Sequence, residues 1–267
     1  MIMRIRVATL SALALLAAPT GPFAPSLHAA EPQPAEAFTY HFSVGPIDGG
    51  RARLAIGQPF DRDQRSFVAV RGEAETAPWL KAIAPLRDEY QVLLSMRNQM
   101  PVEVATIETG LRNRKTKTVF DESGQKADVT VEGGRHSLIG KRTLPAAGRD
   151  PVSLYLHLRR QPLKTNDELT EYLLDRSYLS RINLKVLGRE TIFLDQAHMK
   201  ARAIKVSAVS QRVDDAGNPL PLPARPFLVW LTDDRDRVLL RMEVDAEMGK
   251  ATIELTSYTK GALAQRN

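Results

Sequence analysis

The chain has no cysteine among its 267 residues. It therefore offers no disulfide framework, no thiolate metal site and no cysteine nucleophile. A lipid anchor of the bacterial lipoprotein type is also excluded, because that anchor needs a cysteine at the cleavage point. A chain of this length can still bury enough apolar surface to hold one large domain, or two small ones, by its core alone.

Motifs that carry familiar chemistry are missing as well. The sequence contains no Walker A loop, no Rossmann glycine pattern after a strand and no G-x-S-x-G elbow around a serine. The histidines do not occur in H-E-x-x-H or any other paired spacing, so no zinc site is predicted. They are His28, His41, His136, His157 and His198. We expect no metal, no cofactor and no enzymatic activity.

Long apolar runs are scarce, and the one that stands out is Val7–Ala18. Two arginines precede it and small residues follow it, which is the pattern of a secretory signal peptide. A membrane-spanning helix needs roughly 20 residues, so the run is short for that role. We predict a signal peptide over residues 1–30, a short mature leader over 31–37 and export to the periplasm. A retained N-terminal anchor is the alternative.

The excess of positive charge is small. The whole chain carries +6, and the part after residue 30 carries +4, because Arg4 and Arg6 are the charged residues before it. This balance does not indicate a nucleic-acid binder, and no nucleic-acid partner is predicted. In a cell envelope, the anionic partners within reach are lipid headgroups, lipopolysaccharide and acidic polysaccharide. Peripheral contact with a membrane therefore stays open.

What the chain does have is alternation of apolar and polar residues at period two. It is clear in "RSFVAVRG", "VLLRMEV" and "KATIELTSY", and it is typical of antiparallel strands with one buried face. Turn clusters about every ten residues indicate a sheet that curls on itself. We predict one mainly β domain over residues 38–260, followed by a tail at 261–267. Further strands are expected at 38–44, 50–57, 89–96, 102–109, 112–121, 172–187 (one bent strand or two), 200–209 and 226–232.

Two short segments are predicted to be helical. "APWLKAIAPLR" (77–87) has the composition of a short helix that Pro85 would limit. "DPVSLYLHLRR" (150–160) offers Asp150 as N-cap, Pro151 at the first helical position and two arginines at the end. His157 in this helix is interpreted as a half-buried residue, with a general base as the alternative.

An acidic cluster stands in "WLTDDRDRVLLRMEV" (230–244), where Asp233, Asp234 and Asp236 lie between two predicted strands. Aspartate favours turns because its carboxylate accepts hydrogen bonds from nearby backbone N–H groups. The spacing of a calcium loop is not present. We therefore predict a hairpin turn, with an acid–base or metal site as the alternative, and we expect Trp230 to be buried.

A dense basic stretch occupies residues 112–120. On a strand, Arg112 and Arg114 share one face, while Lys115 and Lys117 share the other. One interpretation is an edge strand charged on both sides to prevent aggregation. The other is a contact with anionic headgroups through these four side chains.

The closing stretch "FLVWLTDDRDRVLLRMEVDAEMGKATIELTSY" resembles the end of the bacterial exported DUF3108 family, and "GPIDGGRARLAI", "DPVSLYLHLRRQPL" and "LGRETI" are similar to its other blocks. The resemblance spans roughly residues 38 to 260. One departure is that the proline usual before the Arg-containing strand is missing. The resemblance implies a half-barrel like that of periplasmic lipoprotein carriers and capsule-export accessory proteins, with a sheet wrapped around short helices. The residues alone leave a closed barrel and a sandwich open. The family implies no catalytic residues.

Three functional hypotheses follow. The first is a non-enzymatic envelope protein that holds a lipid, another amphipathic ligand or an envelope partner in the concavity of the sheet, contacted by Trp230, Tyr155, Arg159 and Arg241. Its structural alternative is a concavity filled as the core. The second is a hydrolase of envelope polysaccharide or peptidoglycan that uses Asp150 or the acids of 233–236. The third is a scaffold that pairs through a sheet edge.

Overall fold

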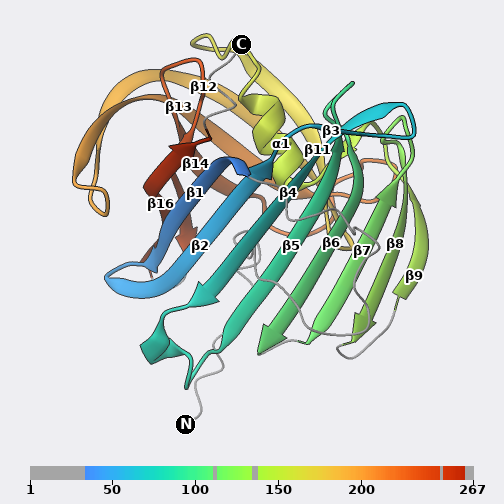
Figure 1. Cartoon of the computed structure of the whole chain (residues 1–267), viewed down its shortest axis with the longest axis horizontal. Helices are drawn as coiled ribbons and strands as arrows, with labels where there is room; N and C mark the ends of the chain where they lie inside the picture. Colours follow the sequence, from blue (N-terminus) through green and yellow to red (C-terminus); the bar gives the residue numbers. More distant parts are fainter. Residues whose placement is uncertain (1–33, 111–112, 134–137, 247–248, 262–267) are drawn as a thin grey trace.

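The computed structural model describes residues 34–110, 113–133, 138–246 and 249–261. In this part of the chain, sixteen strands form one sheet, accompanied by the helix α1 (Pro151–Leu158) and the 3-10 helix η2 (Pro78–Leu80), as Figure 1 shows. The strands are β1 (Pro34–Val44), β2 (Ile47–Gly57), β3 (Phe60–Arg62), β4 (Arg65–Thr76), β5 (Leu86–Ser95), β6 (Pro101–Gly110), β7 (Arg114–Phe120), β8 (Lys126–Gly133), β9 (Leu138–Thr143), β10 (Gly148–Arg149), β11 (Glu168–Asp175), β12 (Tyr178–Leu194), β13 (Met199–Arg212), β14 (Arg225–Thr232), β15 (Leu239–Ala246) and β16 (Gly249–Lys260).

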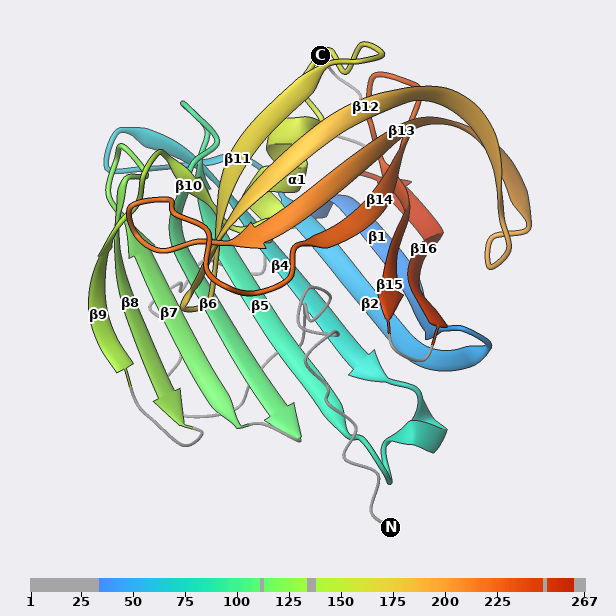
Figure 2. The ribbon, with the colours of Figure 1, turned by 180° about the vertical axis from the view of Figure 1, so that it is seen from behind.

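The strand order explains the curved shape. It runs β10-β11-β12-β13-β14-β15-β16-β1-β2-β4-β5-β6-β7-β8-β9, with β3 beside β4. The short β10–β11 pair is parallel, and the other pairs are antiparallel. The two ends of this order, β9 and β10, are not paired with each other, so the sheet curves without closing into a barrel (Figures 1 and 2). This confirms the predicted curved antiparallel sheet.

The concave side of the sheet is the core. Alternation sends Val70 of β4, Val92 of β5 and Val129 of β8 to this side, where their exposed fractions are 0%, 1% and 1%. Phe38 and Ile204, from distant strands, are each 1% exposed. A cavity able to hold an acyl chain would leave such side chains accessible, so the concavity is filled by the chain itself. Of the two alternatives, the filled concavity is the one observed.

Helix α1 contributes to that filling. Asp150 caps it, and Leu154 and Leu158 pack with Ile182 and Leu184 of β12 in one apolar cluster. The predicted helix over 150–160 is confirmed. Neither helix of the described residues has the length and apolarity that spanning a membrane requires.

The helix expected over residues 77–87 is reduced to the single 3-10 turn η2. Pro85 stops any longer helix, and β5 starts directly after it, with Leu86 paired to Gly110 of β6. The prediction of a short helix at this place was therefore wrong in extent. The connection between β4 and β5 is a compact loop.

The predicted leader over 31–37 also requires correction, because β1 begins at Pro34. Proline and glutamate in this stretch are unfavourable to a strand. However, Ala37 pairs with Ala55 of β2 on one side and with Thr259 of β16 on the other. Sheet pairing on both sides outweighs a composition unfavourable to a strand. The predicted signal peptide lies outside the described residues.

The hairpin of β12 and β13 is long enough to fold over its neighbours. A register shift at Val186/Gly188, where Gly188 has a φ of +144°, reverses which side chains face which side beyond that point. The far end of the hairpin then reaches β16, since the Gln196 amide donates to Glu254 Oε1 at 2.7 Å. Figure 1 shows this hairpin curling beside β14 and β16. The region predicted at 172–187 is thus two strands, β11 and β12.

Candidate functional site

Two of the residues predicted to bind a ligand, Trp230 and Arg241, lie under the β12–β13 hairpin. They are direct cross-strand partners on β14 and β15. Trp230 is 5% exposed, and its Nε1 donates to Glu190 Oε1 at 2.6 Å, while Lys205 Nζ lies 5.1 Å from the ring centroid. Arg241 donates from Nε to Glu254 Oε2 at 2.9 Å and from Nη2 to the Phe193 carbonyl at 2.6 Å. Both side chains are engaged by the chain itself, and Trp230 is buried as predicted.

The other two, Tyr155 and Arg159, come together on α1. The Tyr155 hydroxyl accepts a hydrogen bond from the Leu239 amide at 3.1 Å. Arg159 donates from Nη2 to Glu36 Oε2 at 2.7 Å and from Nε to the Asp236 carbonyl at 2.6 Å. The four residues predicted to share one site therefore form two separate pairs.

The positive charge of Arg159 is compensated by its neighbours. Its guanidinium also lies over the rings of Phe38 and Tyr155, at 5.8 and 5.6 Å from their centroids. Burial disfavours the charge, but Tyr155 and Glu36 together hold the pKa of Arg159 above its usual value. This arginine has a structural role at the junction of α1, β1 and the β14–β15 turn.

The basic stretch is divided by the sheet. Arg114 lies on the concave side in an ion pair with Glu108. Lys117 faces outward and pairs with Glu103 at 3.0 Å, and Lys115 is exposed on the same side. Arg112 lies outside the described residues. The edge-strand interpretation was wrong, because β7 is flanked by β6 and by β8, and the sequence analysis identified neither β8 nor β9.

The acidic cluster of residues 230–244 lies in the turn between β14 and β15, where the sequence predicted a turn. Asp233 pairs with Arg189 at 2.9 Å and with Arg202 at 3.0 Å. Asp234 accepts from the amides of Asp236 and Arg237 at 2.9 and 3.0 Å. Lys260 Nζ donates to Asp236 Oδ1 at 2.6 Å. In the described ranges, no group of three or more His, Asp or Glu side chains is arranged to hold a metal ion.

Asp150, the other candidate acid, is 0% exposed. Its carboxylate accepts from the Val152 amide at 2.9 Å, from the Ser153 amide and from the Tyr90 hydroxyl. Burial raises the pKa of this carboxyl. Enclosed in this way, the carboxylate caps α1 and is out of reach of a polymeric substrate. His157 is partly buried and contacts Glu171 Oε1 at 3.2 Å.

A buried ionic cluster was not predicted. Arg176, in the turn between β11 and β12, lies within 3.5 Å of Asp88, 3.3 Å of Glu108 and 3.0 Å of Asp175. Burial, reinforced by the charge of Glu108, raises the pKa of Asp88 to about 7. The cluster joins residues from β5, β6 and the β11–β12 turn, so spacing along the sequence gives no signal for it.

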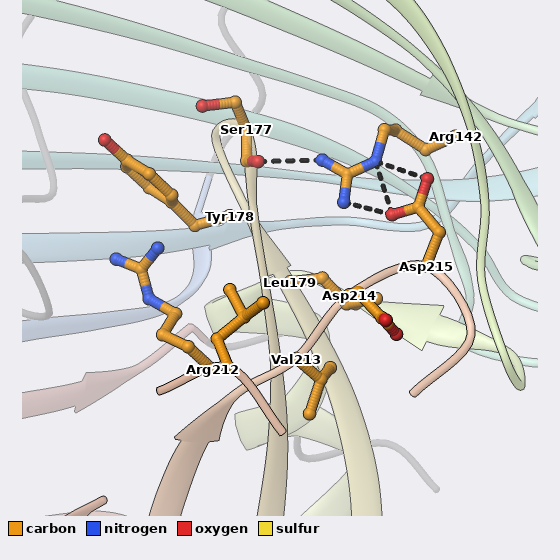
Figure 3. A pocket seen from close by; sticks show the side chains of 9 residues that line it. Arg142, Ser177, Tyr178, Leu179, Arg212, Val213, Asp214 and Asp215 are labelled. Atoms are coloured by element: carbon orange, nitrogen blue, oxygen red, sulfur yellow. Dashed lines mark hydrogen bonds and ion pairs between the residues drawn. The ribbon is translucent and has the colours of Figure 1, made fainter. Parts of the chain in front are cut away.

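One pocket open to solvent lies at the seam, where the two unpaired ends of the sheet approach each other. We use "seam pocket" for the space of about 370 Å³ lined by residues of β9, the start of β12 and the β13–β14 loop. Figure 3 shows its side chains. The lining residues are Arg142, Ser177, Tyr178, Leu179, Arg212, Val213, Asp214, Asp215 and Leu220.

One wall of the seam pocket is a fixed ion pair. Arg142 Nε donates to Asp215 Oδ1 at 2.8 Å, and its Nη1 donates to the Ser177 carbonyl at 2.8 Å. The Asp214 carboxylate accepts from the amides of Ala216 and Asn218 at 2.9 and 2.8 Å. These contacts hold the loop against β9 and commit both carboxylates to their own partners.

The opposite wall is Arg212 stacked on Tyr178. The guanidinium carbon lies 3.8 Å from the ring centroid, well within cation–π range. Within the described part of the chain, this guanidinium has no ion pair and no hydrogen bond from its nitrogens. Burial and the like charge of Arg225 set the pKa of Arg212 below its usual value, although Tyr178 and the charge of Asp175 act in the opposite direction. Since an arginine stays protonated at neutral pH, this is a cation whose surroundings do not fully compensate its charge.

Chemically, the pocket joins this cation to a small apolar surface. Leu220, 38% exposed at the rim, is the accessible part of this apolar surface, whereas Leu179 and Val213 behind it are each 2% exposed. A guanidinium presents planar paired donors that fit a carboxylate or a phosphate. The sequence analysis did not select Arg212 or Tyr178, although the pairing of β12 with β13 brings their ends together.

Comparison with known proteins identifies a matching family profile and a similar solved structure. The sequence profile described as "Protein of unknown function (DUF3108)" matches residues 38–256. No curated protein matches the chain. A β-barrel-like DUF1849 protein from Brucella abortus has a similar structure, with a TM-score of 0.51 and 9% identity over 86% of this chain and 99% of that chain.

Two further structures are more distant. A Bacteroides fragilis protein with a YmcC-like fold covers 86% of this chain and 97% of its own at 8% identity, with a TM-score of 0.38. The lipoprotein LppX of Mycobacterium tuberculosis covers 86% and 89% at 13% identity, with a TM-score of 0.28. Such values carry no functional argument, and the Brucella structure supports the fold alone. The profile match, over most of the chain, confirms the family that the closing block resembles: the protein belongs to the DUF3108 family.

Proposed function

We propose that the protein is an exported, non-enzymatic binding protein that takes ligands with an anionic group and a short apolar part in the seam pocket. The observation that carries this proposal is Arg212, a cation that is stacked on Tyr178 and forms no ion pair with a carboxylate of the described residues. An anionic group bound there would receive charge-assisted hydrogen bonds from a donor that Tyr178 already holds in place.

The size of the pocket sets the kind of ligand. At about 370 Å³ it is near the lower end of the range for small-molecule sites. It can hold a phosphate or carboxylate with a few carbon atoms, or the corresponding end of a larger amphipathic molecule such as a lipid. The filled concavity removes the space that the sequence analysis assigned to an acyl chain. The proposed binding site is therefore at the seam.

Export is the second part of the proposal. It rests on the two arginines, the apolar run and the small residues of the first thirty positions. The expected result is a periplasmic form about 3 kDa lighter than the precursor, the mass of roughly 30 residues. Mass spectrometry of the protein recovered from each cell fraction measures this, and an uncleaved cytoplasmic form would contradict it.

The binding test uses hexyl phosphate as a probe of the combined chemistry. Isothermal titration should detect binding by the wild type and a loss of at least tenfold in Arg212→Gln, since charge-assisted hydrogen bonds contribute about 1.5–3 kcal/mol. Inorganic phosphate and hexanol should each bind more weakly than hexyl phosphate. Arg53→Gln is the matched control, because Arg53 is exposed on the outer face of β2.

Equal affinity of the wild type and Arg212→Gln for hexyl phosphate would contradict the seam site. Equal loss in Arg53→Gln would show that the probe responds only to net charge. Inorganic phosphate binding as tightly as hexyl phosphate would remove the apolar part of the proposal.

A second candidate, a scaffold that pairs through a sheet edge, is favoured by β9. Among the described residues this strand pairs with β8 alone, and Ile139 on it is 84% exposed. A free edge with an exposed isoleucine is a template for strand addition. If a second copy pairs there, sedimentation velocity should show a concentration-dependent dimer that Ile139→Lys abolishes. A monomer at all concentrations would count against pairing between copies.

A further inference from the structure

The short turn between β11 and β12 belongs both to the buried ionic cluster and to the seam pocket. Arg176 points into the interior, where its side chain is 3% exposed, while the next two residues, Ser177 and Tyr178, line the pocket. Asp175 is the cross-strand partner of Tyr178, whose ring is stacked with Arg212, as Figure 3 shows for the pocket side. One short segment of chain therefore connects the buried acids with the cation of the proposed site.

The side chain of Arg176 holds this turn in place. Its backbone has a φ of +56°, in the left-handed region that favours glycine at the first central position of a two-residue turn. Its guanidinium lies 3.5 Å from Asp88, 3.3 Å from Glu108 and 3.0 Å from Asp175. These contacts compensate an unfavourable backbone conformation, so the position of Tyr178 depends on the charges of the cluster.

The cluster contains more acid than base when every group is ionised. Asp88 on β5 is the direct cross-strand partner of Glu108 on β6, and Arg114 is ion-paired with Glu108. Three carboxylates thus share two guanidiniums within ion-pairing distance. Both carboxylate oxygens of Asp88 are buried and accept no hydrogen bond from the described residues, a setting that favours the protonated form. Burial and the charge of Glu108 raise the pKa of Asp88 to about 7, although Arg176 and Arg114 act in the opposite direction.

The remaining surroundings of Asp88 come from β4, from β5 itself and from α1. Ala74 of β4 is its apolar cross-strand partner. Tyr90, two residues further along β5, donates its hydroxyl to Asp150 at the start of α1. Burial raises the pKa of Asp150 and of Asp175 as well. Substitution of Asp88 alone therefore separates its titration from theirs.

We propose that the seam pocket binds its anion together with a proton, which the buried cluster takes up at Asp88. This inference rests on the proposed function and adds its regulation by pH. When Asp88 is ionised, the cluster carries a negative excess that repels an anion at Arg212, and protonation removes that excess. Linkage is reciprocal, so the bound anion raises the proton affinity of Asp88 by the same factor. Binding is therefore tighter in acidic than in alkaline solution.

Isothermal titration with hexanesulfonate measures the coupling. This probe keeps one negative charge throughout, whereas a phosphate monoester gains a proton near neutral pH. The wild type should bind it at least about threefold more tightly at about pH 5.5 than at about pH 8. Asp88→Asn should lose that difference, because its amide does not ionise. Glu103→Gln is the matched control, since it removes a carboxylate on the outer face of β6, and it should keep the difference.

Amide chemical shifts of the unbound protein test the same link without a ligand. The amides of Ser177 and Tyr178 should titrate with a midpoint of about 7 in the wild type and in Glu103→Gln, but not in Asp88→Asn. No such titration in the wild type, or the same titration in Asp88→Asn, would overturn the proposal.

The coupling and the proposed function fail in different ways. Binding of hexanesulfonate that Arg212→Gln weakens, but that is equally tight at both pH values, would overturn the coupling and leave the proposed function standing. Hexanesulfonate that binds at neither pH, or binds equally well to Arg212→Gln, would count against the proposed function and remove the coupling with it.

Discussion

Arg159 and Arg212 are both arginines stacked on aromatic rings, but their surroundings differ. Arg159 at α1 has a carboxylate, a backbone carbonyl and two rings, and its pKa lies above the usual value. Arg212 at the seam has one ring and no ion pair with a described carboxylate, and its pKa lies below the usual value. The residue type and the stacking are the same, so the partners alone distinguish a structural arginine from one that can receive a ligand.

The interior of the sheet and the seam differ in the same way, in how their arginines are partnered. Inside the sheet, Arg176 meets three carboxylates, so the interior has a surplus of acid. At the seam, the two lining carboxylates are bound to Arg142 or to backbone amides, so Arg212 is left without a direct carboxylate partner among the described residues. In the interior of the sheet, removal of a side chain should lower the free energy of unfolding. At the seam, it should lower the affinity for a ligand instead.

The largest loss of stability is expected for Trp230→Ala. The ring is buried beneath the β12–β13 hairpin and bonded to Glu190. Its removal should lower the free energy of unfolding by about 3–5 kcal/mol, the usual range for a buried aromatic side chain. Urea denaturation measures the change. A loss below about 1 kcal/mol would mean that the β12–β13 hairpin does not bury Trp230 against β14 in solution.

Arg159→Gln is expected to cost about 2–4 kcal/mol. Removing one partner of a largely buried pair leaves Glu36 without its counter-charge. The double variant Arg159→Gln/Glu36→Gln should recover part of the loss, which a double-mutant cycle of unfolding free energies detects. Additive losses would show that the two side chains are not coupled, and the contrast with Arg212 would then weaken.

Asp88 tests the acid surplus through pH. Its folded pKa of about 7 lies above the ordinary value of 3.8, so the folded state holds a proton that the unfolded state releases. Stability is therefore fully present below about pH 4 and is lost as the pH rises toward 7. We expect wild type to lose roughly 1–3 kcal/mol relative to Asp88→Asn across this window. Thermal melts of the two proteins at pH 4.5 and 7.5 measure this difference. An equal change in melting temperature for both proteins between the two pH values would exclude a raised pKa of Asp88.

The smallest effects on stability are expected for Arg212→Gln and Asp236→Asn, each below about 1 kcal/mol. Arg212 makes no described ion pair, and Asp236 keeps its backbone carbonyl bond to Arg159 when its side chain changes. Melting temperatures measure both. A loss of more than 2 kcal/mol in Arg212→Gln would place this arginine with the structural ones.

The sequence was informative where the signal is local. Alternation located most strands, Asp150 and Pro151 identified α1, and the aspartates of 233–236 identified a turn. It failed where distant strands decide the outcome. Residues 34–37 became strand through pairing with β2 and β16, and β7 became an inner strand because β8 and β9 extend the sheet.

The candidate site shows the same limit. Trp230 and Arg241 could be placed together from the hairpin pattern, but the hairpin that covers them folds over from residues 190–204 through a shift at Gly188. The seam pocket forms where β9, the β11–β12 turn and the β13–β14 loop come together. No spacing in the sequence encodes that meeting, so Arg212 and Tyr178 became visible only in the fold.

The central claim is that the seam, and not the filled concavity, receives the ligand. Chemical-shift mapping of the isotope-labelled protein with hexyl phosphate tests it most directly. The account predicts that the amides of Tyr178, Leu179 and residues 213–215 shift with the probe concentration, while those of Val70 and Val92 on the concave face stay in place. Shifts at Val70 and Val92 without shifts at the seam would contradict it and return the ligand to the concavity.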